Sequence, residues 1–60
     1  MGLVTTRSQM RQLKDGELFV AGDAEHVADG DAHVSGDASY DGYIVYDQTG
    51  ESWLEDDFPE

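Results

Sequence analysis

Cysteine is absent from this chain of 60 residues, which excludes disulfides, thiolate metal sites and cysteine nucleophiles together. A domain of this length buries only about 60% of the surface that its unfolded chain exposes. Domains this small usually gain stability from disulfides, metals or partner subunits. We therefore expect the chain to work as a homo-oligomer or as a subunit of a larger protein complex.

Long hydrophobic runs are also absent. No segment approaches the run of about 18 apolar residues that a membrane span needs. The first residues lack both the positive region and the apolar region of a signal peptide. The sequence thus predicts neither a membrane partner nor export by such a leader.

Positive charge is scarce, since 3 Lys and Arg stand against 14 Asp and Glu, for a net charge of −11. Repulsion at this density destabilises a compact fold unless counterions screen it, and at molar salt the Debye length falls to about 3 Å. Such a composition is similar to that of proteins from salt-in halophiles, whose cytoplasm is one expected location. Nucleic acid is not an expected partner, because its phosphates would meet carboxylates.

The few cations are gathered at one end of the chain. Arg7, Arg11 and Lys14 all lie in residues 1–14, which hold no acid, whereas every acid lies in residues 15–60. Charge asymmetry of this kind is typical of an interaction surface. One hypothesis is that the basic segment of one copy contacts the acidic body of a neighbour or partner.

Three segments follow from the local patterns: a basic N-terminal segment (1–16), an acidic antiparallel β domain (17–54) and an acidic C-terminal tail (55–60). Thr6 and Gln9 match a capping box, which predicts a short helix over residues 6–14 with Gly16 at its C-terminal end.

From residue 17 onward the apolar pattern has the period of a strand. Gly22-Asp23 suits a type II′ turn and Asp29-Gly30 a type I′ turn, which predicts a three-stranded meander over residues 17–35. This register places Leu18 opposite Val27 and collects the aliphatic side chains on one face: Leu18, Val20, Val27, Ala32 and Val34. The other face carries Phe19, His26, His33, Ala21, Ala24 and Ser35.

A second hairpin is expected near the C-terminus. Residues 43–46 are aromatic and β-branched, residues 47–50 suit a four-residue turn, and the returning strand 51–54 places Trp53 opposite Ile44. The predicted fold is mainly β: a short N-terminal helix followed by an antiparallel meander of about five short strands. The near-hexad spacing of the glycines also allows a β-helix of stacked repeats.

Few patterns point to chemistry. His26 and His33 lie opposite each other in the predicted meander, near enough for one zinc or copper ion, but the favoured interpretation is a solvated pair of polar residues on the exposed face, with no metal. Counting from Asp31, the twelfth residue is Gly42 rather than the Glu of a calcium loop. No nucleophile motif or phosphate-binding glycine motif is present, so we expect no catalysis and no cofactor.

The segment 41–53, DGYIVYDQTGESW, resembles the short hairpin of tailed-virus fibre and head-fibre proteins. The match rests on a pattern of glycine, hydrophobic residue, Val-Tyr-Asp, Thr-Gly and Trp, carried by Tyr46, Asp47, Thr49, Gly50 and Trp53. The resemblance implies a virion structural component, often trimeric, and in this acidic background a haloarchaeal virus.

Two functions are consistent with these patterns. The first is a non-catalytic structural or decorating subunit of a larger assembly adapted to high salt, with a virion as the assembly that the resemblance implies. The alternative is an acidic inhibitor that mimics DNA and occupies a basic protein groove. The expected partner-binding residues are the cations and the aromatics of the last third: Arg7, Arg11, Lys14, Tyr43, Tyr46, Trp53 and Phe58.

Overall fold

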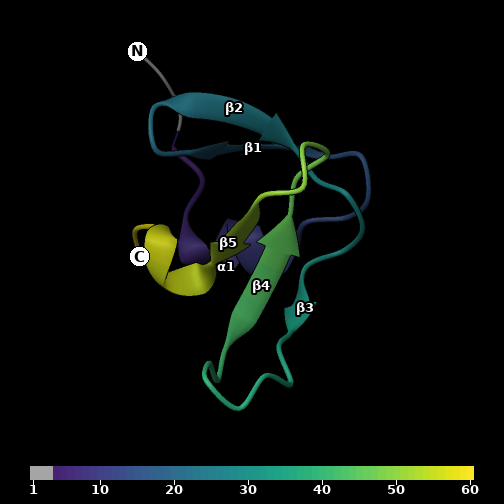
Figure 1. Cartoon of the computed structure of the whole chain (residues 1–60). Helices are drawn as coiled ribbons and strands as arrows, with labels where there is room; N and C mark the ends of the chain where they lie inside the picture. The colour runs from purple at the N-terminus through teal and green to yellow at the C-terminus, as the bar shows by residue number, and fades with distance from the viewer. Residues whose placement is uncertain (1–3) are drawn as a thin grey trace.

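The computed structural model describes residues 4–60 and contains five short strands, one short helix and a 3₁₀ turn. In chain order they are α1 (Arg7–Arg11), β1 (Leu18–Ala21), β2 (Ala24–Val27), β3 (His33–Val34), β4 (Tyr43–Tyr46), β5 (Ser52–Leu54) and the 3₁₀ helix η1 (Glu55–Asp57). The strands form two antiparallel sheets, β1-β2 and β3-β4-β5. The β1-β2 hairpin lies across one end of the three-stranded sheet (Figure 1). The expectation of a mainly β chain with a short helix is confirmed, whereas the single meander is wrong.

The capping box at the start of α1 forms as expected. The Thr6 hydroxyl accepts from the Gln9 amide at 3.2 Å, and the Gln9 side chain accepts from the Thr6 amide at 2.9 Å. Two donors at the amino end of the helix are thereby satisfied. The unit is encoded locally, which is why the sequence pattern reveals it.

The helix ends earlier than predicted, at Arg11 rather than at residue 14. The Leu13 amide bonds to the carbonyl three residues back, at Met10, and the Leu13 carbonyl accepts from Ala32 at 3.0 Å. Gly16, with φ +83°, lies beyond the helix and donates to the Ala28 carbonyl at 2.9 Å. Contacts with the distant segment 28–32 thus end the helix.

The first hairpin has the predicted register. Leu18 lies opposite Val27 and Val20 opposite Glu25. Gly22 occupies the turn with φ +63°, a conformation that favours glycine and matches the two-residue turn expected there.

The second predicted turn, at Asp29-Gly30, does not return the chain along β2. His33 instead pairs with Ile44, and Val34 pairs with Tyr43, so β3 belongs to the other sheet. The cause lies in the backbone of residues 28–32: the Asp29 amide donates to the Tyr46 carbonyl at 2.7 Å, so the chain after β2 runs onto β4. Because both sheets are antiparallel, the β-helix alternative is also wrong.

The apolar face predicted for the meander is inverted. Phe19 and Ala21 are buried, whereas Leu18 is 64% and Val34 58% exposed. Without the third strand of that meander, no strand among residues 4–60 covers the Leu18 face. Phe19 points the other way and packs against the rings of Trp53 and Phe58, at centroid distances of 6.5 and 6.0 Å.

The C-terminal hairpin forms one register step away from the prediction. Ile44 lies opposite Leu54, and Val45 lies opposite Trp53. The Asp47 amide donates to the Glu51 carbonyl at 2.9 Å, so the turn contains residues 48–50 rather than 47–50.

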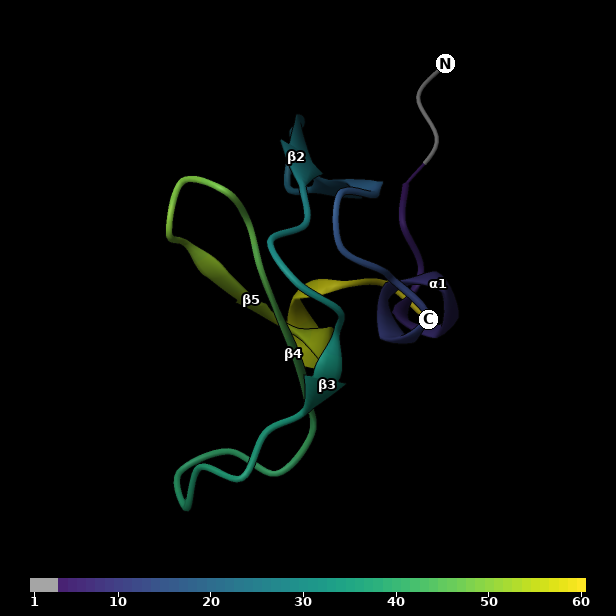
Figure 2. The ribbon, with the colours of Figure 1, turned by 90° about the vertical axis from the view of Figure 1, so that its right-hand side faces the viewer.

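The core draws on both ends of the chain. Its buried apolar members come from the N-terminal helix region, the first hairpin, β4 and the C-terminus: Met10, Leu13, Phe19, Ala21, Ala28, Val45 and Phe58. Residues 55–60 are not an extended tail, because η1 packs against α1 and the C-terminus lies beside that helix (Figure 2). Within residues 4–60, no helix is long and apolar enough to cross a membrane.

Candidate functional site

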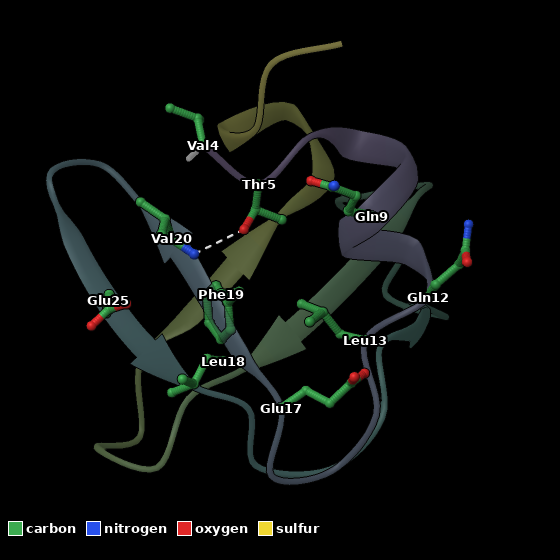
Figure 3. Close-up of a pocket in the computed structure, with 10 residues that line it drawn as sticks. All are labelled: Val4, Thr5, Gln9, Gln12, Leu13, Glu17, Leu18, Phe19, Val20 and Glu25. Carbon is green, nitrogen blue, oxygen red and sulfur yellow. Dashed lines mark hydrogen bonds between the residues drawn. The ribbon is translucent and has the colours of Figure 1, made fainter. Parts of the chain in front are cut away.

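A groove of about 470 Å³ runs between α1 and the outer edge of β1 (Figure 3). Gln9 and Gln12 lie on the helix side, and Leu18, Val20 and Glu25 lie on the hairpin side. Two buried side chains, Phe19 and Leu13, contribute apolar surface to its lining. The groove therefore has an apolar base, a polar helix side and a mixed hairpin side.

The hairpin side of the groove is an unpaired strand edge. The Ala28 amide donates to the Glu17 carbonyl at 2.8 Å, so the backbone of Glu17, just before β1, bonds toward the β2 side. Because hydrogen-bonded and non-hydrogen-bonded pairs alternate along an antiparallel ladder, the N–H and C=O groups of Leu18 and Val20 point away from β2 and toward the groove. The Val20 amide is taken by the Thr5 hydroxyl at 2.9 Å, as Figure 3 shows. The Leu18 amide and carbonyl have no partner among residues 4–60.

The rim combines exposed apolar side chains with negative charge. Leu18 is 64% and Val4 56% exposed. The charged residues that line the groove are Glu17 and Glu25, and no Lys or Arg of the described chain lines it. Sequence reasoning missed this site because it assigned the Leu18 face to the core.

Arg7 and Arg11, two of the cations expected to bind a partner, connect the two ends of the chain. The Arg11 guanidinium lies 2.8 Å from the Glu55 carboxylate. The Arg7 Nε donates to the carbonyls of Glu55 and Phe58 at 3.1 and 3.0 Å, and its guanidinium lies 3.8 Å from Glu60. We call these four residues, Arg7, Arg11, Glu55 and Glu60, the terminal clasp.

Lys14, the third cation, lies 3.6 Å from the Asp31 carboxylate, with both side chains largely exposed. All three cations are therefore within ion-pair distance of a carboxylate of their own chain. Their clustering in sequence has an intramolecular explanation. This explanation competes with the expectation that the cations contact a partner, which no contact of the described residues tests.

The predicted aromatic contact residues differ in exposure. Tyr46 is 42% exposed, whereas Tyr43 and Trp53 are partly buried against the core. The Arg11 guanidinium lies over the Tyr43 ring, 5.7 Å from its centroid. Phe58 is only 2% exposed and fills the core beside Phe19, so its expected partner contact stays a prediction.

His26 and His33, the metal candidates, do not face each other. The His26 Nδ1 lies 2.8 Å from an Asp47 carboxylate oxygen, while the His33 Nδ1 lies 3.1 Å from the Asp31 carbonyl. The His33 ring stacks on Tyr46 in the other sheet. The described residues contain no group of three or more His, Cys, Asp or Glu that could hold a metal ion.

Asp47 is the one charged side chain in the described interior, with 1% of its surface exposed. One carboxylate oxygen accepts from the Thr49 hydroxyl at 2.6 Å, the Thr49 amide at 2.9 Å and the Glu51 amide at 3.0 Å. The Thr49 hydroxyl chiefly lowers the pKa of Asp47 to about 2; burial opposes the shift, and the Glu51 and Thr49 amides and His26 support it. We call Asp47 and His26 the buried tie.

The ionised Asp47 carboxylate determines that the His26 Nδ1 acts as a hydrogen-bond donor. An ionised carboxylate only accepts hydrogen bonds, so the His26 Nδ1 carries the proton and donates. The imidazole is stacked on Phe19 at 5.4 Å and lies 4.7 Å from the Trp53 ring. The Thr49 hydroxyl donates to the other carboxylate oxygen of Asp47. The pair thus joins β2 to the turn after β4.

Comparison of the chain with protein-family models, with curated proteins and with solved structures finds no match.

Proposed function

We propose that this chain is a non-catalytic structural or decorating subunit of a larger assembly, adapted to high salt, and that it acts by protein–protein contact. The resemblance of its second hairpin to virion fibre proteins makes a haloarchaeal virion the proposed setting. The proposed location is accordingly a virion or the cytoplasm of a salt-in halophile.

The observation that carries the proposal is the internal pairing of every cation. Asp31, Glu55 and Glu60 lie against the three cations, and the other 11 of the 14 acids form no ion pair with Lys or Arg among residues 4–60. The surface left for a partner is therefore anionic, with exposed apolar residues at Val4, Leu18, Val34 and Tyr46. Such a surface fits a protein partner with a basic contact region.

Mass measurement by light scattering in about 2–3 M KCl, where the Debye length is only a few ångströms, tests this function. We expect a mass above the 6.6 kDa of one chain, either from self-association or from a complex with a basic virion protein. A strict monomer that binds no such protein would count against it.

The alternative, an acidic mimic of DNA, is favoured by the same unpaired carboxylates, which would occupy a groove built for phosphates. The dependence of binding and folding on salt concentration distinguishes the two functions. A mimic binds its basic target more tightly at low salt, because the attraction is then least screened. A salt-adapted subunit instead loses its folded circular-dichroism signal below about 0.5 M salt, where screening weakens.

A further inference from the structure

We propose that the outer edge of β1 binds a short, extended, basic segment of the partner protein, which adds to the β1-β2 sheet as a third strand. The inference rests on the proposed function and specifies the partner's chemistry. Its geometry comes from the groove between β1 and α1 (Figure 3).

The unpaired backbone groups of β1 are the first observation that supports strand addition. In strand addition, an incoming chain bonds to the unpaired N–H and C=O groups of a sheet edge. Leu18 presents both groups toward the groove, and neither has a partner among residues 4–60. The neighbouring Val20 amide is already taken by the Thr5 hydroxyl at 2.9 Å. The incoming segment is therefore centred on Leu18 and lies beside Thr5.

Side chains supply the second argument. An added strand places alternate side chains on opposite faces of the sheet. One face of β1 carries Leu18, which is 64% exposed, and the groove base carries the buried Phe19. Apolar side chains of the segment would cover Leu18, and the exposed Val4 lies on the same rim.

The charge of the groove indicates which kind of segment can bind there. Glu17 and Glu25 line the groove, and no Lys or Arg of the described residues offsets them there. A second copy would bring another chain of net charge −11 to the same edge and would offer no free Lys or Arg to Glu17 and Glu25, because all three of its cations lie within ion-pair distance of their own carboxylates. A segment with Lys or Arg next to apolar residues satisfies both the carboxylates and Leu18.

A synthetic probe tests the proposal: the capped peptide Lys-Val-Lys-Val-Lys, titrated into the ¹⁵N-labelled protein at the lowest KCl concentration that keeps it folded. We expect the Leu18 amide to exchange rapidly in the free protein and at least about tenfold more slowly with saturating peptide, because it gains a hydrogen bond. The control peptide has the same side chains but every backbone amide methylated. It keeps the charge and cannot donate to a strand edge.

Matched protein variants localise the contact. Val34 is a second exposed residue whose amide faces away from its sheet, on the edge of β3 and outside the groove. Leu18→Arg should weaken peptide binding at least about tenfold, because it removes an apolar contact and adds repulsion. Val34→Arg adds the same charge elsewhere and should leave binding within about twofold.

Several results would overturn the proposal. Equal binding of the methylated peptide, or equal weakening by Val34→Arg, would mean general attraction to the anionic surface; the proposed function would then stand without this site. A Leu18 amide already protected in the free protein would mean that a second copy or the chain's own N-terminus occupies the edge. Absence of peptide binding would refute the edge site, while the mass measurement above judges the proposed function separately.

Discussion

The terminal clasp and the buried tie both join distant parts of the chain through charge, but they differ in exposure. In the clasp, Arg11 is 47% and Glu55 17% exposed at the side chain. In the tie, His26 is 16% and Asp47 2% exposed. Salt screens exposed pairs far more than buried ones. At high salt the fold therefore depends on the tie and the aromatic core around it, and the clasp contributes mainly at low salt.

The largest loss of stability should come from removing the Phe19 ring, which contacts both His26 of the buried tie and the aromatic side chains of the core. Phe19 is 2% exposed and packs against His26, Trp53 and Phe58. Phe19→Ala should reduce the free energy of unfolding by about 3–5 kcal/mol, through lost burial and the cavity left behind. Denaturant unfolding in high KCl measures it. Leu18→Ala, at the exposed neighbouring position, is the control and should change stability by less than about 0.5 kcal/mol.

The next largest effect should come from the tie itself. Asp47→Ala removes the buried carboxylate that accepts from the Thr49 and Glu51 amides and from the His26 Nδ1. Partly buried donors left without an acceptor are costly, so the melting temperature should fall clearly both at the lowest salt concentration that keeps the chain folded and at high salt.

Asp37→Ala is the matched control for that variant. Asp37 accepts from the Ser39 amide and hydroxyl, both at 2.8 Å, in the same arrangement that Asp47 makes with Thr49, but it is exposed. Its removal should have a much smaller effect on melting. Equal losses for the two variants would contradict the claim that burial distinguishes the tie.

Acid should weaken the tie in a defined pH range. Because the folded pKa of Asp47, about 2, lies below its ordinary value of 3.8, the unfolded chain takes up this proton first as the pH falls. The stabilisation by Asp47 is thus complete above about pH 4 and is lost as the pH falls toward 2. The difference in unfolding free energy between wild type and Asp47→Asn should shrink over this interval. A difference independent of pH would contradict the assignment.

The smallest expected effect belongs to the clasp. Arg11→Gln removes the exposed pair with Glu55 and should cost about 0.2–1 kcal/mol at low salt. In about 2–3 M KCl the cost should nearly vanish, because the Debye length is then shorter than typical surface charge separations. Chemical denaturation at the lowest and highest workable salt concentrations measures both values. A cost that persists in molar salt would mean that the clasp resembles the tie.

Features encoded within a few residues could be predicted from the sequence. The Thr6–Gln9 capping box and the hairpin closed at Gly22 depend on neighbours in the chain, and both form as expected. Turn chemistry was insufficient at Asp29-Gly30, because the Asp29 amide is taken by Tyr46 from another sheet. Local pattern could not reveal that competition.

The candidate site required tertiary information. The exposure of Leu18 follows from the position of β3 in the other sheet, and the pairing of Arg11 with Glu55 joins residues 44 apart in the chain. The same limit applies to His26 and Asp47, which are 21 residues apart. Composition did reveal that cations are few and that the rest of the surface is acidic.

The central claim is that the three cations serve the chain's own fold, so that the surface offered to a partner is anionic. The most direct test is the light-scattering mass of the variant with Arg7, Arg11 and Lys14 all replaced by Gln, compared with wild type in about 2–3 M KCl. We predict an unchanged assembly mass together with lower stability at low salt. Loss of assembly with unchanged stability would contradict the claim and assign the cations to the partner contact.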